Sequence, residues 1–500
     1  MNSMNNGNKR LRNISLFTGI LAAVCAALFF LWNAGSFLPG WIVWKNVAFS
    51  FSDSDSDSGS SSGQPGRYGI LLSHKTVRVF YDGTLIWTSP KGVKVQDVLS
   101  FDIDNDRQNE LILLCWKIGR YGAQKPFWVD EDERKWSQHI FLYEYGQGEI
   151  KPKWMSSYLG QDVTEMTANV REKTYNRLFL TDLDGKVNGW KWDSWGFTKE
   201  DTDVSFTVCG DNLIHEPLYR YALRSDTSFG FLFHNLKDTI SQSDIAVIHQ
   251  ETPLTDNPSL YGGYPRFGTP AGVGNAIADA GFDVAVCATN HAMDRGADGV
   301  SFTKEFFVSH GITCLGIQSE DEKDYRPYEI LEKNGIRFAL LNYTYGTNGI
   351  PLPADSPHMV HLLEEEEKIK NDIRQAKAAS DFVLIFVHWG TEYTAQPDIS
   401  QQAWTQLFLE CEADVVIGTH PHALQPYGLL ESESGHKMLV YYSIGNYISA
   451  QKEKTCVKGG LATFTVSLTS DGYAVTEYGL QPLSITHEGG GKFMVDFDSR

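Results

Sequence analysis

The sequence predicts an α/β fold for the second half of the chain, preceded by a β-rich region and a membrane helix. From residue 204 onward, apolar runs typical of strands alternate with helix-like stretches, as in an α/β layer fold. Residues 67–200 contain short alternating runs rich in aromatic residues, such as Thr76–Tyr81, which fit strands. Near the N-terminus, 19 successive residues carry no charge. We therefore expect an anchor, a β-domain and an α/β domain.

The composition excludes two classes of protein. Lys and Arg number 43 against 62 Asp and Glu among 500 residues, a formal charge of −19. Binding to nucleic acid needs clustered basic side chains, so no nucleic-acid partner is expected. Hydrophobic residues make up 42% of the chain, which is enough for packed cores. The mean hydropathy of −0.28 excludes a protein with many membrane spans.

The uncharged run covers residues 14–32 and nearly matches a hydrocarbon core of about 30 Å. Three basic residues precede it, so the positive-inside rule keeps residues 1–13 in the cytoplasm as a tail. Residues 14–34 then form a single-pass transmembrane anchor in the cell membrane, with the bulk of the chain extracellular. A cleaved signal peptide is the alternative, but such peptides have a shorter apolar run that ends at small residues.

Residues 52–66 contain Asp, Ser and Gly but no aliphatic or aromatic side chain, which indicates a flexible linker. After it, an internal repeat supports strands over residues 67–200. Trp87 and Trp154 each precede an Asn-led apolar run by 22 residues, and the two copies are offset by 67. At about 40–45 residues per blade this region is too short for a closed propeller. We expect an open, blade-like β-domain.

The first copy of the repeat carries a run of alternate acids, namely Asp102, Asp104, Asp106 and then Glu110. Alternate carboxylates in a turn supply the oxygen ligands that Ca²⁺ prefers. The pattern resembles the calcium loops of FG-GAP-type β-propeller blades, whereas the second copy has lost these acids. The loop is therefore a candidate calcium site, and an Asx-rich turn without an ion is the alternative.

Five apolar runs after residue 204 end at residues suited to chemistry. These residues are Asp211, then His249 with Glu251, Asn290 with His291, His388, and His420 with His422. In open α/β sheets, ligands bind outside the carboxyl ends of the strands, so we expect these side chains to share one cleft. Imidazole, carboxylate and amide donors suit Mn, Zn or Fe. The pattern predicts a divalent metal centre of one or two ions, although a lone histidine at a strand end is usually only hydrogen-bonded.

The same motifs, in the same order, resemble the CapA family of poly-γ-glutamate capsule-synthesis proteins, which are similar in fold to calcineurin-like metallophosphatases. The resemblance covers residues 204–450 and includes six motifs, from Gly210-Asp211 to the run that ends at Asn446. It implies a four-layer metallophosphatase-like sandwich. Residues 451–500 contain further strand-like runs, which we expect to complete the domain.

Carried over residue by residue, the resemblance implies the ligands of two ions. The ligands of the first ion are Asp211, the bridging Glu251 and His422. The ligands of the second ion are Asn290, His388 and His420, with Glu251 shared between the two ions.

The resemblance also implies that His291 protonates the leaving group. One departure concerns the first ion, because the family usually has His two residues after the first Asp, and Leu213 stands there. Leucine cannot coordinate a metal. His249 or His215 could supply the missing nitrogen, so both remain candidate additional ligands.

Two functions follow as expectations. The first is a membrane-anchored extracellular protein of cell-surface polymer synthesis or remodelling, with a metal-dependent hydrolase site for a phosphoester or a γ-glutamyl amide of an anionic polymer. The second is a non-catalytic assembly or export factor that works with other polymer-synthase subunits and whose metal site is structural or degenerate. The metal content of the purified protein distinguishes them.

Overall fold

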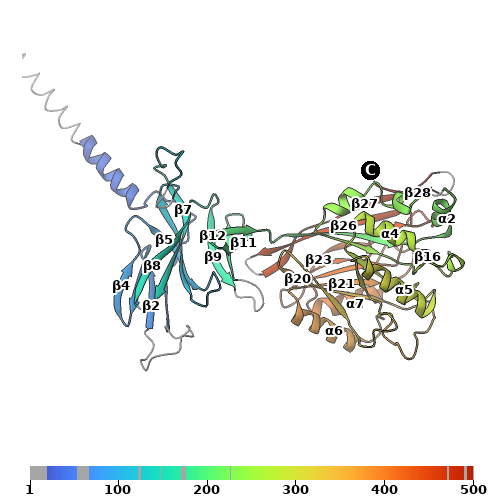
Figure 1. Ribbon diagram of the computed structural model, residues 1–500. Helices are drawn as coiled ribbons and strands as arrows, with labels where there is room; N and C mark the ends of the chain where they lie inside the picture. The colour runs from blue at the N-terminus through green and yellow to red at the C-terminus, as the bar shows by residue number, and fades with distance from the viewer. Residues whose placement is uncertain are drawn as a thin grey trace, which may run out of the picture. The chain divides into compact units, whose positions relative to one another are not determined.

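The structure is a computed structural model (Figure 1) that describes residues 20–52, 67–121, 125–146, 148–169, 176–225, 227–469, 472–488 and 492–498. The chain divides into two compact units, Met1–Asp201 and Thr202–Arg500.

The first unit consists of three antiparallel sheets of four strands, and in each sheet the strands follow one another in chain order. The first sheet contains β1 (Val47–Ser52), β2 (Arg67–Ser73), β3 (Thr76–Tyr81) and β4 (Thr84–Thr88). The second contains β5 (Lys94–Phe101), β6 (Glu110–Ile118), β7 (Trp136–Gly146) and β8 (Glu149–Met155). The third contains β9 (Val163–Asn169), β10 (Arg177–Asp182), β11 (Val187–Asp193) and β12 (Gly196–Glu200).

The second sheet is buried on both faces. Along β6, Leu111 and Leu113 pack in one core with residues of the first sheet. Ile112 and Leu114, which point to the opposite face, pack in another core with residues of the third sheet. This double burial explains why β6 is an unbroken apolar run rather than an alternating one. The unit is β-rich as the sequence predicted, while its resemblance to FG-GAP blades stays a prediction.

The predicted start of the β-domain at residue 67 is wrong, because the first sheet begins earlier. β1 pairs antiparallel with β2 over their full lengths, from Val47 opposite Leu72 to Ser52 opposite Arg67. The alternating sequence of β1 supplies Phe49 and Phe51 to the same core as β2. Apart from Ser52, the predicted linker 52–66 lies outside the described residues.

The predicted membrane anchor, residues 14–34, falls partly outside the described residues. Residues 20–33 are helical and their side chains are largely exposed. In the part of the chain that the structure describes, no helix combines the length and the apolar character needed to cross a bilayer.

The first sheet of the second unit mixes parallel and antiparallel strands. Its strands, in spatial order, are β18 (Thr313–Leu315), β17 (Val284–Val286), β14 (Ile245–His249), β13 (Val204–Asn212), β26 (Lys458–Thr469), β27 (Gly472–Glu488) and β28 (Lys492–Phe497), and β25 (Asn446–Ile448) pairs with β13. The strands from β18 to β13 are parallel, whereas β26 joins β13 antiparallel. Residues after 451 thus extend this sheet.

The second sheet is parallel except at its two edges. Its order is β19 (Tyr328–Lys333), β20 (Ile336–Thr344), β21 (Phe382–His388), β22 (Val415–Thr419), β24 (Lys437–Tyr441) and β23 (Tyr427–Glu431). Two short strands, β15 (Leu254–Thr255) and β16 (Thr269–Pro270), form a separate pair.

Helices cover the outer faces of both sheets (Figure 1). Over the first sheet lie α2 (Glu216–Ser225), η2 (Phe229–Leu232), α3 (Lys237–Gln242), α4 (Ala271–Ala280) and α5 (Gly296–Ser309). Over the second lie α6 (Glu366–Ala379) and α7 (Ile399–Glu410). The short η3 (Pro258–Leu260) belongs to a loop. A further core, with Val208 and Phe386 among its members, fills the space between the sheets. The second unit is therefore a four-layer α/β sandwich, and the α/β prediction is confirmed.

In the first unit, a lysine from another strand contacts the acids of the candidate calcium loop. Asp102, Asp104 and Glu110 place carboxylate oxygens within 4.8 Å of one another. Lys153 of β8 donates to Asp104 Oδ2 at 2.5 Å and to Glu110 Oε1 at 2.7 Å. Asp106 instead accepts a hydrogen bond from the Gln108 amide. An ammonium group thus supplies the positive charge that a calcium ion would bring, and calcium binding stays a prediction.

We predict that Lys153→Met exposes this cluster to metal. Removing one partner of a buried ion pair costs about 3 kcal/mol, so the variant unfolds at lower denaturant concentration than the wild type. Millimolar Ca²⁺ should restore part of that stability in the variant and leave the wild type unchanged, as measured by urea unfolding with and without Ca²⁺. Stabilisation of the wild type by Ca²⁺ would contradict the role given to Lys153.

Candidate metal centre

The chemically important residues of the second unit lie at the carboxyl ends of parallel strands. Asp211 of β13 is in register with His249 of β14, and His388, the last residue of β21, is in register with Thr419 of β22. The two sheets are joined at this edge, because the His420 amide donates to Asp211 Oδ2 at 3.1 Å. The strand-end side chains of both sheets therefore meet in one place, as expected for α/β sheets.

Close backbone approach positions Asp211. The preceding residue is Gly210, and a Cβ atom there would lie 2.0 Å from the Gly445 carbonyl oxygen. The Asp211 amide donates to that same carbonyl at 3.0 Å. Because any side chain at residue 210 would clash, only glycine lets this hydrogen bond hold the carboxylate at the junction of β13 and the 445–448 segment.

Two buried carboxylates face His422. Asp211 Oδ2 is 3.3 Å from His422 Nδ1, and Glu251 Oε1 is 3.8 Å from His422 Nε2. Asp211 is 0% and Glu251 1% exposed. Asp211 Oδ1 and both Glu251 carboxylate oxygens have no hydrogen-bond partner among the described residues. Burying such oxygens without partners is costly, so the cluster calls for a cation.

The tautomer of His422 leaves one ring nitrogen free for that cation. Asn446 Nδ2 donates to Ser449 Oγ, Gln451 Oε1 and the Cys456 carbonyl. Asn446 Oδ1 must therefore be the acceptor at 2.9 Å from His422 Nδ1. With Nδ1 donating its proton, Nε2 is the nitrogen of His422 that offers a lone pair to a metal.

A second set of donors lies beside the first. His388 Nε2 is 3.0 Å from Asn290 Oδ1, and His388 Nδ1 is 2.9 Å from Thr419 Oγ1. Thr419 Oγ1 is also 2.9 Å from His249 Nδ1, which connects His249 to the ligand set through a hydroxyl. A metal bound by Asn290 and His388 would replace the hydrogen bond that now joins them.

The histidines after β22 are held in an unusual backbone conformation. His420 and His422 have φ values of 94° and 53°, which side-chain-bearing residues rarely adopt. His420 Nδ1 is buried and has no hydrogen-bond partner among the described residues. Strained residues of this kind persist where the surroundings over-determine them, and they concentrate at functional sites.

His291 forms a dyad with a carboxylate. Its Nδ1 is 2.7 Å from Asp294 Oδ2, which also accepts from the Phe267 amide at 2.7 Å. The Phe267 ring packs against His291 at a centroid distance of 4.7 Å. A carboxylate that holds Nδ1 orients the ring and leaves Nε2 to exchange a proton with a substrate.

Burial and the neighbouring charges shift the pKa values of the residues in the centre. Burial raises the pKa of Glu251 well above its usual value, and the neighbouring Asp211 carboxylate adds to the effect. Burial opposes charge on His422 as well, but Glu251 and Asp211 outweigh it and raise its pKa to about 9. Burial lowers the pKa of His420 to about 3. In the protein without an ion, the His422 imidazolium therefore supplies the positive charge.

These residues fit a divalent cation. Asp211, Glu251 and His422 place ligand atoms within 4.8 Å of one another, and the donors are oxygen and imidazole nitrogen, the set that suits Mn, Zn or Fe. Of the two proposed replacements for Leu213, His249 bonds Thr419 through Nδ1, and its Nε2 is buried with no hydrogen-bond partner among the described residues, so it stays a candidate ligand. The Nδ1 atom of His215 is already used, because it accepts from the Ala450 amide at 3.3 Å.

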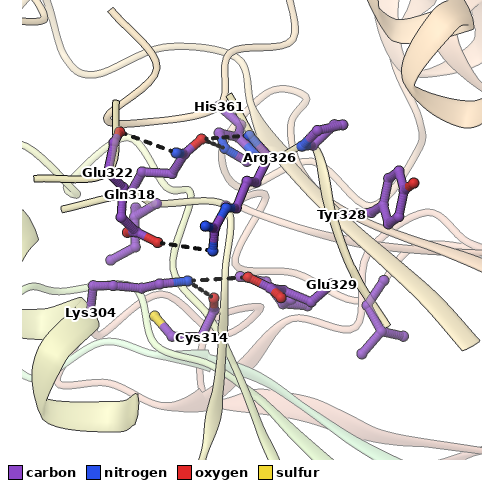
Figure 2. Close-up of a pocket in the computed structure, with 13 residues that line it drawn as sticks. Lys304, Cys314, Gln318, Glu322, Arg326, Tyr328, Glu329 and His361 are labelled. Atoms are coloured by element: carbon purple, nitrogen blue, oxygen red, sulfur yellow. Dashed lines mark hydrogen bonds and ion pairs between the residues drawn. The ribbon is translucent and has the colours of Figure 1, made fainter. Parts of the chain in front are cut away.

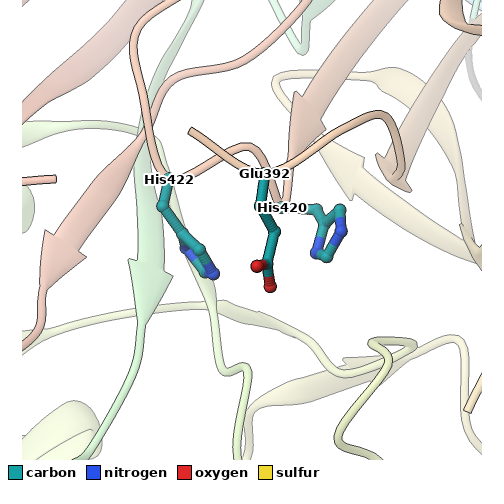
Figure 3. Close-up of side chains that lie close together, drawn as sticks. All are labelled: Glu392, His420 and His422. Atoms are coloured by element: carbon teal, nitrogen blue, oxygen red, sulfur yellow. The ribbon is translucent and has the colours of Figure 1, made fainter. Parts of the chain in front are cut away.

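Sequence reasoning missed several side chains of the centre. Asp294 and Asn446 were part of the motifs, and an Asp three residues after a His in a turn is a signal that could have identified the dyad. Nothing in the sequence around Thr419 indicated that its hydroxyl contacts His388 and His249. Glu392, which no motif indicated, lies near His420 and His422, and Figure 3 shows its carboxylate between the two imidazole rings.

A separate pocket of ≈ 250 Å³ lies elsewhere in the second unit (Figure 2). Its charged side chains are matched in pairs: Lys304 Nζ is 3.5 Å from Glu329 Oε1, and Arg326 Nη1 is 3.9 Å from Glu322 Oε1. Lys304 also donates to the Cys314 carbonyl at 2.8 Å. The residues of the metal centre do not line this pocket.

The second unit is similar in sequence to known capsule-synthesis proteins. Residues 205–451 match the family model "Bacterial capsule synthesis protein PGA_cap". A Bacillus anthracis "Capsule biosynthesis protein CapA" is 26% identical over 263 residues, which cover 51% of this chain and 61% of that protein. A Bacillus subtilis (strain 168) "PGA biosynthesis protein CapA" is 29% identical over 187 residues, or 35% and 44% of the two chains. The chain thus spans about half the length of these relatives. They support the resemblance to the CapA family.

Solved structures also align with this chain. The calcineurin-like phosphoesterase YfkN from Bacillus subtilis aligns over 56% of this chain and 90% of its own, at 15% identity and a TM-score of 0.30. A putative 5′-nucleotidase from Staphylococcus aureus in complex with α-ketoglutarate aligns over 56% and 54%, at 13% identity and a TM-score of 0.33.

The protonation of His422 predicts how metal binding depends on pH. Because the carboxylates raise its pKa to about 9, His422 carries a proton at pH 7 that a bound ion must displace. Binding of Mn²⁺ to the metal-free chain at pH 7 should release about one proton. The affinity should rise about tenfold per pH unit as the pH increases toward the pKa of His422.

Calorimetry in buffers of different ionisation enthalpy counts the protons released. His422→Ala removes the titrating group and serves as the control. An affinity that does not change with pH in the wild type would contradict the assignment of His422 as a ligand.

Proposed function

We propose that this chain takes part in the synthesis or remodelling of a cell-surface polymer of the poly-γ-glutamate type, through a metal-dependent hydrolase site in its second unit. The observation that carries the proposal is the buried pair Asp211 and Glu251, whose carboxylates leave three oxygens without partners beside His422. Without an ion such a pair would destabilise the fold, since unpartnered buried charge is strongly destabilising.

The chain's own residues have distinct tasks in this proposal. A bound divalent cation polarises a substrate oxygen and makes hydroxide available near neutral pH. The strand-end carboxylates and imidazoles hold the cation, and the hydrogen bond between the His420 amide and Asp211 keeps the two sheets in register at the site. His291, oriented by Asp294, protonates the leaving group. The substrate is a phosphoester or a γ-glutamyl amide.

The net charge supports a role for metal in binding an anionic polymer. A protein with a formal charge of −19 repels a polyanion. Cations in the centre offset that repulsion where the substrate must approach. The names of the two relatives, which concern capsule and PGA biosynthesis, agree with such a polymer.

A second candidate function is a non-catalytic assembly or export factor that acts with other polymer-synthase subunits. Leu213 favours it, because this side chain is buried next to Asp211 and cannot coordinate an ion. In that case the metal-loaded protein would bind the ion without hydrolysing either substrate class.

Hydrolysis by the Mn²⁺- or Zn²⁺-loaded full chain, assayed on a phosphodiester and on poly-γ-glutamate, tests the main proposal. We predict that His291→Ala slows cleavage by about 10²–10⁴-fold while metal binding persists, because the proton donor is lost and the ligands are kept. His310→Ala, which changes an exposed histidine at the end of α5, should retain the wild-type rate. Equal rates for His291→Ala and the wild type would exclude His291 as the general acid.

Anchoring in the cell membrane by residues 14–34, with the bulk of the chain outside, belongs to the same proposal. The sequence of this segment supports it, and so does an aromatic pair in the first unit. Phe127 and Trp128 are 94% and 71% exposed, in the loop that joins β6 to β7. Trp136, at the start of β7, donates to the Trp32 carbonyl at the end of the 20–33 helix. The loop and the helix thus leave the same end of the sheet, where a membrane interface would favour aromatic side chains.

We predict that Trp128 contacts lipid in the reconstituted full chain. Brominated lipids in phosphatidylcholine vesicles should quench the Trp128 fluorescence, so Trp128→Phe should reduce the quenchable signal. Trp195→Phe is the matched control, because Trp195 is 84% exposed in the turn between β11 and β12. Equal loss of quenching in the two variants would contradict contact between the loop and the membrane.

A further inference from the structure

Glu392 lies in the loop that follows β21 and leads to α7. The loop is held at both ends: Thr391 Oγ1 donates to Asp398 Oδ2 at 2.8 Å, and Gln425 Nε2 donates to the Gln396 carbonyl at 3.1 Å. It begins at Gly390, whose φ of 90° and close contact with Gln401 suit glycine alone. The position of Glu392 is therefore determined by a packed loop rather than by a free surface segment.

The same loop is bonded directly to the histidines of the centre. The amide of Tyr393 donates to the Pro421 carbonyl at 2.7 Å, and Pro421 stands between His420 and His422 in the sequence. Tyr393 has a φ of 66°, the same left-handed region that both histidines occupy. This hydrogen bond holds Glu392 against the two imidazoles.

Glu392, His420 and His422 place one ligand atom each within 4.8 Å of one another. Their carboxylate and rings face a common space (Figure 3). His420 is only 3% exposed, and its Nδ1 has no hydrogen-bond partner among the described residues. A buried, unpartnered imidazole nitrogen beside a carboxylate is the arrangement that a cation would satisfy.

His422 has only one ring nitrogen free to bind a metal, so it can be a ligand of only one ion. Its Nδ1 is committed to Asn446 Oδ1, so its Nε2 serves one ion, the one beside Asp211 and Glu251. His420 and Glu392 are then left to a different ion. Glu392 brings that ion closer to solvent, since Glu392 is exposed whereas His420 and the other ligands are buried.

We propose that Glu392 is a third carboxylate of the metal centre and, with His420, a ligand of an outer cation distinct from the inner cation at Asp211, Glu251 and His422. This inference rests on the proposed function, because both require the centre to hold metal. Asn290 Oδ1 and His388 Nε2, 3.0 Å apart, are the adjacent donors that complete the outer set.

The charges of the ligands favour this assignment. Two divalent ions bring four positive charges to a site whose buried carboxylates, Asp211 and Glu251, bring two negative ones. A third carboxylate at Glu392 reduces the excess positive charge that the low-dielectric site must hold. Because Glu392 is exposed, water competes for the outer ion more than for the inner one. The outer ion should therefore bind more weakly and exchange faster.

Titration of the metal-stripped full chain with MnCl₂ tests the assignment, with bound and free Mn²⁺ measured by calorimetry and by electron paramagnetic resonance. The wild type should bind two Mn²⁺ with unequal affinities. Glu392→Gln should weaken the looser site by at least about tenfold and leave the tighter site unchanged, whereas Asp211→Asn should weaken the tighter site. Glu392→Asp, which keeps a carboxylate, should recover part of the affinity.

Glu433→Gln is the matched control, because Glu433 is exposed in the turn between β23 and β24 and should bind as the wild type does. Thermal unfolding without metal should give the same midpoint for Glu392→Gln and the wild type. A smaller rise of that midpoint with Mn²⁺ would then report a lost ligand rather than a lost fold.

The outcomes separate the two proposals. Two Mn²⁺ sites in the wild type and unchanged sites in Glu392→Gln would overturn the role of Glu392 alone. No Mn²⁺ binding by the wild type would overturn the metal centre and the proposed function together.

Discussion

Asp211 and Glu251 are carboxylates held inside the protein, at the line where two β-sheets meet, with three oxygens that no described donor satisfies. Their negative charge needs a positive partner, because the interior screens charge far less than water does. Without an ion, the His422 imidazolium provides it. With an ion, that proton must leave. The arrangement around these two side chains follows from this requirement.

Close backbone contacts hold these carboxylates and the histidines in place, and they leave no room for larger side chains. Gly210 lets β13 approach the Gly445 carbonyl, and a Cβ at Gly418 would lie 2.2 Å from the Tyr442 carbonyl oxygen. Beyond those glycines, the chain bends so that His420 and His422 take positive φ values. The energy that such backbone costs is offset by the surrounding packing. The ligand geometry is consequently a property of the whole junction between the sheets.

In the first unit, clustered carboxylates are neutralised by a lysine instead of a histidine or an ion. There, Asp104 and Glu110 also bring carboxylates together, but Lys153 lies between them and satisfies both with one ammonium group. That cluster is complete by itself. The centre of the second unit has no lysine or arginine among its described ion-pair partners, only histidines: burial lowers the pKa of His388, and the proton on His422 is one that an ion can displace. This difference separates a cluster that stabilises a fold from one that has capacity for an ion.

Much of the fold and of the candidate site of the second unit could be predicted from local sequence. Apolar runs that end in Asp, Glu, Asn or His define strands and the side chains at their ends, and parallel strands bring those ends to one edge, so the α/β fold and the strand-end cluster were accessible. The dyad of His291 and Asp294 could be predicted too, since the two residues are three positions apart in the sequence. The boundary at residue 67 was not, because only pairing with β2 shows that Val47–Ser52 is a strand.

What tertiary structure alone decided are contacts between residues far apart in the chain. Lys153 reaches Asp104 across 49 residues, and Asn446 selects the tautomer of His422 across 24. Glu392 reaches the histidines through a loop whose path depends on Pro421 and Gln425. Hydrophobic periodicity records which face of an element is buried. It contains no information on which polar side chain from another element lies opposite, because that depends on sheet register and loop packing. The sequence by itself therefore determined the kinds of ligand atoms and the sheet edge that carries them, and the tertiary structure decided which of them lie beside one another.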